Sequence, residues 1–150
     1  MDAINTLIEG VKLEEIMPDL QVFLERLVPW IAWAVRIGPM ALLIRGLLYL
    51  YAPPKEANHT LGFRTYFGMG SVQAWQFTQK LAGKVLSILG GALTLVMWII
   101  SFFFRGMDAF RMMRWASICL VIQILLMLGA YIYIRIVVAK KFDKNGNLRK

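Results

Sequence analysis

Three long apolar runs constrain the fold of this 150-residue chain more than any other feature. Residues 27–51 carry two arginines, residues 85–104 carry no charge, and residues 115–139 carry one arginine near their end. A helix needs roughly 20 apolar residues to cross a hydrocarbon core about 30 Å thick, and each run has that length. We therefore predict an all-α integral membrane protein with three transmembrane helices.

Composition agrees with this prediction and argues against a nucleic-acid-binding protein. Hydrophobic residues make up 59% of the chain and charged residues only 17%, which is outside the usual range of soluble domains. The formal net charge is +8, but the basic residues flank the apolar runs instead of forming one soluble face. We expect a protein of the lipid bilayer with no nucleic-acid partner.

The distribution of lysine and arginine predicts the orientation in the membrane. With three spans, the N-terminal tail and the turn at 105–114 share one side and carry five basic residues. Residues 52–84 and the end from Arg135 share the other side and carry ten. Basic residues gather on the cytoplasmic side, so we predict a multi-pass protein of the bacterial cytoplasmic membrane, with its N-terminus outside and its C-terminus cytoplasmic. The basic end, KKFDKNGNLRK, is expected to be a solvated tail or to be attracted to anionic lipid.

The first 26 residues differ in character from the rest. They contain six acidic and two basic residues, and their first apolar residues follow helical spacing. An amphipathic helix on a membrane surface normally carries basic residues, so this one is predicted to pack on protein. Pro18 interrupts the pattern and is a suitable opening residue for a second helix that continues into the first span. We divide the chain into an acidic amphipathic N-terminal helix, 1–26, and a membrane domain, 27–150.

The segment between the first two spans, residues 52–84, is too polar to cross a membrane and too aromatic for a solvated linker. Ser71 stands at a helix N-cap position, and the apolar rows that follow it predict a lead-in helix that enters the membrane without a loop. The preceding residues form either an interfacial loop or a folded polar cap. In the second case four residues contact one another or a ligand: Asn58, His59, Arg64 and Thr65. Arg64, with five donors, is the predicted anchor of the loop, and Trp75 is predicted to pack on the first span or the loop.

The motifs in this segment resemble those of the SdpI family of small bacterial membrane proteins. That family carries a G-[YF]-R-T motif, an S-x-x-A-W motif and a Gly-Lys ending before the next helix, and this chain has LGFRT, SVQAW and LAGK there. It departs from the pattern where YFGMG stands in place of a proline and a basic residue. The resemblance covers about residues 30–140. Its matching positions are Asn58, Gly62, Phe63, Arg64, Thr65, Ser71, Ala74, Trp75, Ala82, Gly83 and Lys84.

This resemblance implies a role in immunity or sensing. The family's named member protects bacteria from their own secreted killing peptide and is similar to a receptor that holds a transcriptional repressor at the membrane. It implies a peptide toxin and a cytoplasmic repressor as partners. The alternative is a non-catalytic accessory or assembly subunit of a larger membrane complex, and the oligomeric state stays open. The candidate ligand-binding, partner-binding or loop-anchoring residues are Asn58, His59, Gly62, Arg64, Thr65, Ser71, Trp75, Lys84 and Arg36.

The chain lacks the residues that most catalytic and metal sites need. His59 is the only histidine and Cys119, the only cysteine, lies within an apolar run, so no His/Cys metal set is possible. His59 would serve Ser71 as a base only if Glu56 oriented its imidazole. We predict no enzymatic activity, no metal and no cofactor.

Arg36 is the candidate site residue within the first span. It lies about nine residues into the span, roughly 13 Å deep at 1.5 Å per residue, and so near the bilayer centre. No span contains an acidic residue that would pair with it, whereas Arg45 is near enough to the end of the span to reach the headgroups. Arg36 is therefore either structural or awaits an acidic group of a peptide, lipid or partner subunit. Its candidate partners within the chain are Gln123, Thr94, Ser101 and the carbonyls that Pro39 frees.

Overall fold

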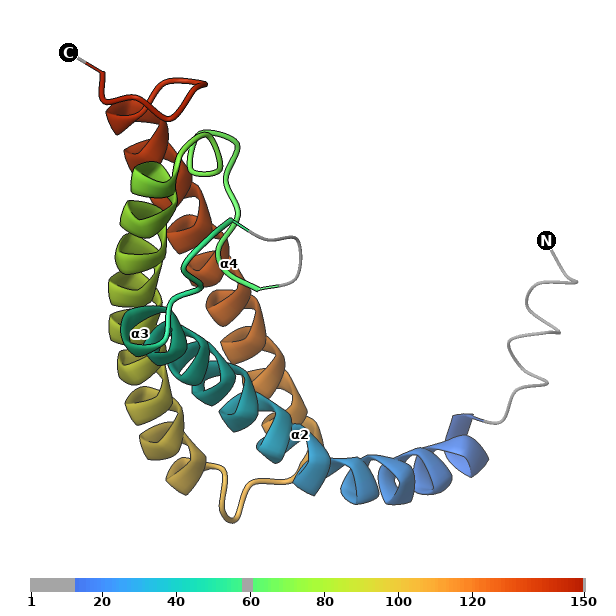
Figure 1. Cartoon of the computed structure of the whole chain (residues 1–150). Coiled ribbons are helices and arrows are strands. Elements are labelled where there is room, and N and C mark those ends of the chain that lie inside the picture. The colour runs from blue at the N-terminus through green and yellow to red at the C-terminus, as the bar shows by residue number, and fades with distance from the viewer. Residues whose placement is uncertain (1–12, 58–60, 150) are drawn as a thin grey trace, which may run out of the picture.

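The computed structural model describes residues 13–57 and 61–149, which form three long helices. They are α2 (Leu13–Tyr51), α3 (Val72–Phe103) and α4 (Ala109–Lys141), and the described residues contain no strand beyond one isolated bridge. Pro29–Tyr51 of α2 and the whole of α3 and α4 are long and apolar enough to cross a membrane. The predicted all-α membrane protein with three spans is confirmed, and Figure 1 shows the helices in order from blue to red.

α3 and α4 begin before the apolar runs of the sequence, each at a residue that caps the helix. Ser71 is the N-cap of α3, because its Oγ accepts a hydrogen bond from the Ala74 N–H at 3.1 Å. The predicted lead-in helix and the second span are therefore one continuous helix. Asp108 caps α4 by accepting the Arg111 N–H at 3.1 Å, so α4 begins well before its apolar run.

α2 runs through Pro18, where the sequence predicts the opening of a second helix. It begins at Leu13 and continues without a break to Tyr51. A proline removes one backbone hydrogen bond and bends a helix, but it does not have to end one. Figure 1 shows that α2 changes direction along its length, so that its N-terminal part points away from the other two helices. The remainder of the predicted N-terminal helix, residues 1–12, lies outside the described residues.

Close packing of α2 against α3 depends on two glycines. A Cβ at Gly46 would overlap the backbone of Ser87, and a Cβ at Gly90 would overlap the backbone of Leu43. Small residues at a helix crossing let two backbones come into van der Waals contact. This packing places Arg45, next to Gly46, level with the start of the uncharged run of α3.

α4 is joined to α2 by a hydrogen bond that a proline makes necessary. Pro39 has no N–H, so the helix cannot satisfy the carbonyl of Val35, four residues earlier, in the usual way. Gln123 of α4 donates from Nε2 to this oxygen at 3.2 Å, and the bond is buried. The predicted carbonyl freed by Pro39 therefore exists, but it is bonded by Gln123 and not by Arg36.

The basic C-terminal end, predicted to be solvated or attracted to anionic lipid, folds into a hairpin, and its residues Lys144 and Arg149 are exposed. Phe142 and Leu148 form an antiparallel bridge. Asp143 holds the turn between them, because its Oδ1 accepts the N–H groups of Asn145 and Asn147 at 2.9 and 2.8 Å. These side-chain-to-backbone bonds are typical of Asx turns. We call residues 142–149 the C-terminal hairpin.

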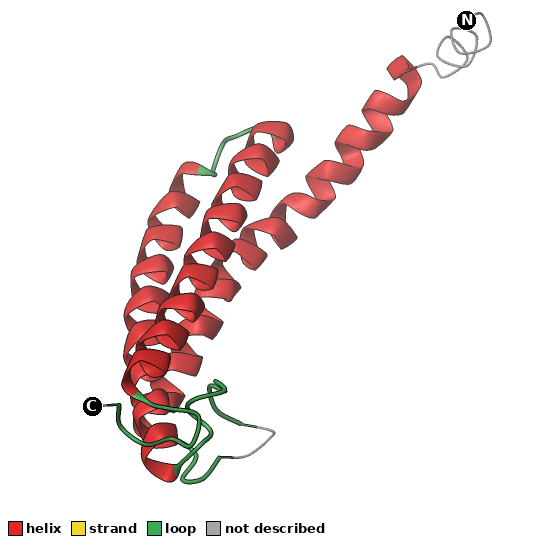
Figure 2. Ribbon diagram, turned by 90° about the horizontal axis from the view of Figure 1, so that it is seen from above, coloured by secondary structure: helices red, strands yellow, loops and turns green. Residues whose placement is uncertain are grey.

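The C-terminal hairpin packs against the start of α3. Phe142 is 1% exposed, and its ring centroid lies 5.5 Å from that of Phe77. Ser71 Oγ donates to the Gly146 carbonyl at 2.8 Å. Figure 2 shows that this hairpin and the loop between α2 and α3 lie together at one end of the bundle, while the α3–α4 turn lies at the other.

Candidate functional site

We call the loop between α2 and α3, residues 52–71, the motif loop. Trp75 in the first turn of α3 packs against this loop and bonds it. This side chain is 0% exposed, and its Nε1 donates to the Pro54 carbonyl at 2.8 Å. Gly62 lies across the indole with a φ of 105°, and a Cβ there would come within 2.6 Å of the ring. Only glycine combines this backbone conformation with this approach. The structure thus places Trp75 beneath the motif loop, as the sequence predicts.

Gln79, one helical turn after Trp75, also bonds the motif loop to α3. Its Nε2 donates to the Phe63 carbonyl at 2.9 Å, and its Oε1 accepts the Phe63 N–H at 2.8 Å. Gln79 is 0% exposed, so its buried amide satisfies both backbone polar groups of Phe63, the N–H and the carbonyl. Thr65, 5% exposed, accepts the Gly68 N–H at 2.9 Å and closes the next turn of the loop.

The motif loop, fastened in this way, covers one end of a cavity of about 470 Å³ between α2 and α4. The ring of Phe63 in the loop lies 5.2 Å from that of Tyr131 in α4. Pockets that bind small molecules or cofactors have volumes of roughly 300–1,000 Å³ and mostly apolar walls. The cavity fits this description, and its walls are Leu42, Arg45, Tyr49, Gly62, Phe63, Arg64, Leu86, Ile124, Met127, Leu128 and Tyr131.

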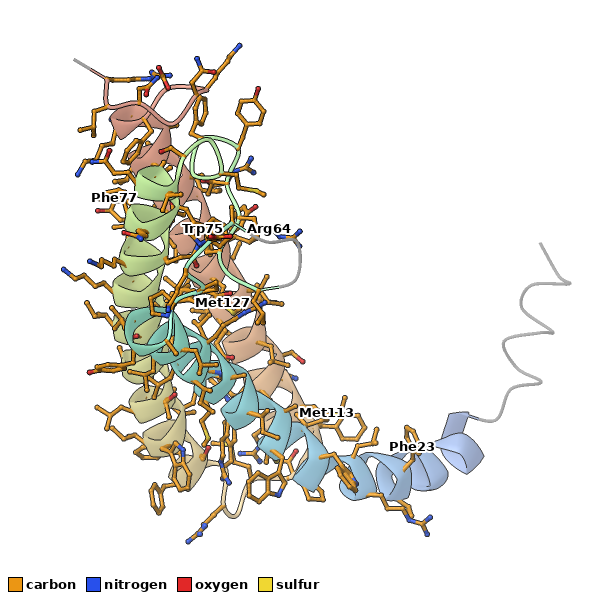
Figure 3. The ribbon with its side chains drawn as sticks, in the orientation of Figure 1. Phe23, Arg64, Trp75, Phe77, Met113 and Met127 are labelled. Atoms are coloured by element: carbon orange, nitrogen blue, oxygen red, sulfur yellow. The ribbon has the colours of Figure 1, made fainter. Side chains whose placement is uncertain are left out.

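Two arginines carry the charge of this cavity. Arg45 donates from Nε to the Tyr49 hydroxyl at 3.1 Å, whereas Arg64 makes no hydrogen bond or ion pair with any described residue. Both side chains are exposed, and none of the described residues that line the cavity is acidic. Figure 3 shows Arg64 on the motif loop, above Met127 of α4 in this view. The cavity therefore combines apolar walls with two guanidinium groups that have no anionic partner among the described residues.

The structure separates the predicted site residues into several groups. Gly62 and Arg64 line the cavity, while Thr65, Ser71 and Trp75 hold the motif loop from outside it. Lys84 is exposed on α3 and does not line the cavity. Asn58 and His59 lie outside the described residues. Gln79 and Trp75 hold the described part of the loop, and the loop-anchoring role of Arg64 stays a prediction.

Arg36 lies at the opposite end of the bundle. Its Nε donates to Ser101 Oγ at 2.8 Å, which confirms one predicted partner, and Ser101 stands in the last turn of α3. The guanidinium carbon is 5.8 Å from the centroid of the Trp33 ring and 5.6 Å from that of Trp98. Tryptophans gather at membrane interfaces, so this environment favours a position of Arg36 nearer a membrane surface than the sequence count suggests. The depth near the bilayer centre stays a prediction, because the spans are defined by length and composition only.

Sequence reasoning missed several residues that build the site. Arg45 was expected only to reach the headgroups, and no role was predicted for Gln79, which follows Trp75 by four residues. That i, i+4 spacing is the signal that would have found Gln79, because a buried glutamine next to a buried tryptophan needs a partner. Tyr49 and Tyr131 had no signal beyond their place near the ends of spans.

Comparison with known families decides the assignment. Residues 55–134, just over half of the chain, match the SdpI/YfhL protein family. The chain belongs to the SdpI/YfhL family. The matched range covers most of the motif loop, all of α3 and most of α4. The residues that line the cavity from these three segments therefore lie within the matched range. The match begins at residue 55, whereas the predicted resemblance begins at about residue 30. The residues of α2 that line the cavity therefore lie outside the match. No curated protein and no solved structure matches the chain significantly.

Proposed function

We propose that this SdpI-family membrane protein gives immunity to, or senses, an antimicrobial peptide that enters the membrane, and that the peptide binds in the cavity beneath the motif loop. The observation that carries this proposal is the cavity itself. It is about 470 Å³ in volume, mostly apolar, and lined by two arginines that have no acidic partner in the described part of the chain. An amphipathic peptide with a terminal or side-chain carboxylate matches such walls, because arginine binds carboxylates through two parallel hydrogen bonds.

Contact between the motif loop and the C-terminal hairpin supports a sensing role. Ser71 at the end of the loop bonds Gly146 of the hairpin, and the Arg149 guanidinium carbon lies 5.5 Å from the Phe67 ring centroid. A peptide that moves the loop would therefore disturb the hairpin. A cytoplasmic repressor is the proposed partner that detects this change.

Survival under toxin challenge tests the proposal. The chain is expressed in bacteria that lack their own immunity protein, and the cells are exposed to the killing peptide countered by the family's named member and to supernatant from the native host. We expect wild-type protein to restore growth and Arg64→Ala and Arg64→Lys to lose most of that protection. Lys55→Ala, which removes one charge from the same loop outside the cavity, is the control and should protect normally. Equal protection by all four proteins would remove Arg64 from the site.

The projecting part of α2 favours a second candidate function, that of an accessory subunit. Figures 1 and 3 show this part extending away from α3 and α4, with Phe23 on it. Phe23 and Trp30 are 57% and 73% exposed, which leaves an aromatic surface for a partner subunit. Under this proposal Phe23→Ala/Trp30→Ala releases a co-purifying membrane protein, and under the immunity proposal it leaves toxin protection unchanged.

A further inference from the structure

Arg45 lies where its guanidinium can meet an anionic headgroup. Its neighbour Gly46 packs on Leu86 and Ser87, directly after Lys84, the last charge before the uncharged run of α3. Arg45 is therefore about one helical turn from the end of the apolar run on the side of the motif loop. Its side chain is exposed, and the hydroxyl of Tyr49 is uncharged. An arginine at this depth reaches the headgroup region, where anionic lipid phosphates attract it.

Arg64 brings further positive charge to this cavity, and Arg135 lies beside it in a neighbouring pocket. Arg64 reaches the cavity from the motif loop, and the Arg135 guanidinium carbon lies 5.4 Å from the ring centroid of Tyr131, which lines the cavity. The lining residues that the structure describes include no acidic one. Guanidinium groups match phosphate oxygens with paired hydrogen bonds and are weakly hydrated. The loop end of the cavity is therefore suited to a phosphate.

The rest of the cavity is suited to a hydrocarbon chain. Leu42, Ile124 and Leu128 continue its walls toward the crossing where Gln123 bonds Val35, which brings α2 and α4 together. Ile124 and Leu128 are 55% and 52% exposed, so this part of the cavity opens sideways toward the bilayer and not into water. A ligand would enter from the membrane with its charged end at the loop.

We propose that an anionic phospholipid from the leaflet on the side of the motif loop occupies the cavity. Its phosphate lies between Arg45 and Arg64, and part of one acyl chain lies along Leu42, Ile124 and Leu128. Basic pockets between transmembrane helices at a membrane surface bind anionic headgroups in this way. The proposal does not depend on the immunity role, and it adds that a peptide entering the cavity competes with a resident lipid.

Native mass spectrometry of the purified full chain tests the proposal. The protein is released from nanodiscs that contain equal amounts of phosphatidylglycerol and phosphatidylcholine, and the lipids it retains are counted. We expect wild-type protein to retain phosphatidylglycerol selectively, and Arg45→Gln/Arg64→Gln to reduce that retention by about tenfold or more. Lys80→Gln/Lys140→Gln removes two exposed charges outside the cavity and should retain lipid as the wild type does.

A third variant separates a lipid in the cavity from lipid held at the surface by charge. Leu128→Trp fills the apolar part of the cavity without changing any charge, and it should also reduce retention of phosphatidylglycerol. Unchanged retention in Leu128→Trp or in the double arginine variant would overturn the proposal. Equal retention of the two lipids by the wild type would do the same. If no lipid is retained but Leu128→Trp abolishes toxin protection, the cavity binds the peptide alone, and the lipid proposal fails while the proposed function stands.

Discussion

At the scale of single residues, Gly62 links the family motif to a physical requirement. Its φ of 105° is strained for any residue with a Cβ, and the added carbon would overlap the Trp75 ring. We expect Gly62→Ala to lower the free energy of unfolding by about 2 kcal/mol or more, measured by thermal unfolding in detergent.

Gly129 provides the matched control for that substitution. It lies within α4, and a Cβ there would have no neighbour within 4 Å. Gly129→Ala should be neutral or slightly stabilising, because alanine has a higher helix propensity than glycine. Similar losses in both variants would mean that helix or membrane effects, and not the contact with Trp75, cause the loss at Gly62.

Residue roles were predictable where they depend on local sequence. Ser71 was predicted as a helix cap, because capping is decided within one turn. Ser101 was identified as a partner of Arg36 only as one of several polar residues in the spans. Gln79 and Arg45 were missed in their roles, because those roles depend on how the motif loop and α2 lie in space.

At the scale of helices, the α2–α4 crossing depends on Pro39 and Gln123 together. Gln123 donates to the Val35 carbonyl, which Pro39 leaves without its helical partner. We expect Gln123→Leu to destabilise the protein by about 1–3 kcal/mol, because a buried carbonyl loses the donor that replaces the missing N–H of Pro39. In a Pro39→Ala background the helical N–H is restored, so the same substitution should cost clearly less.

A double-mutant cycle measured by unfolding in detergent checks this expectation. The quantity of interest is the difference between the two effects of Gln123→Leu, with and without Pro39. Equal effects in both backgrounds would show that Gln123 stabilises the crossing by packing alone and that Pro39 plays no part.

The C-terminal hairpin should be sensitive to acid. Hydrogen bonds from the Asn147 backbone hold the pKa of Asp143 below its ordinary value of 3.8, and Asn145 and Arg149 act in the same direction. A lowered pKa in the folded state means that the ionised carboxylate stabilises the hairpin above 3.8. This contribution is lost as the pH falls through the lowered pKa.

Loss of this contribution should let the C-terminal hairpin open in acid. A fluorescent probe attached to the cysteine of a Lys144→Cys, Cys119→Ala protein reports this opening. We expect the signal to change reversibly on acidification below the ordinary aspartate range, with no matching change at higher pH. Asp143→Asn should remove the pH dependence of the fluorescence, because the asparagine side chain carries no charge to lose. An unaltered transition in Asp143→Asn would assign the change to another group.

At the scale of the whole molecule, hydropathy predicted the three spans because length and apolar content are properties of continuous segments. The cavity was not predictable from them. It exists because Gly46 and Gly90 hold α2 against α3, Gln123 bonds α2 to α4 at Val35, and the motif loop covers the remaining gap. Each of these contacts joins residues far apart in the sequence.

The motif loop and the C-terminal hairpin lie at the same end of the bundle, which allows a test of how the protein is oriented in the membrane. Ser71 bonds Gly146, so the two segments must lie on the same side of the membrane. That side carries ten of the flanking basic residues against five on the other, which predicts that it is cytoplasmic. In a Cys119→Ala background, a membrane-impermeant maleimide applied to intact cells should label Met107→Cys in the α3–α4 turn. It should label Tyr66→Cys and Lys144→Cys only after permeabilisation. The reverse pattern would invert the orientation and leave the fold intact, whereas labelling Tyr66→Cys and Lys144→Cys from opposite sides would contradict the bundle itself.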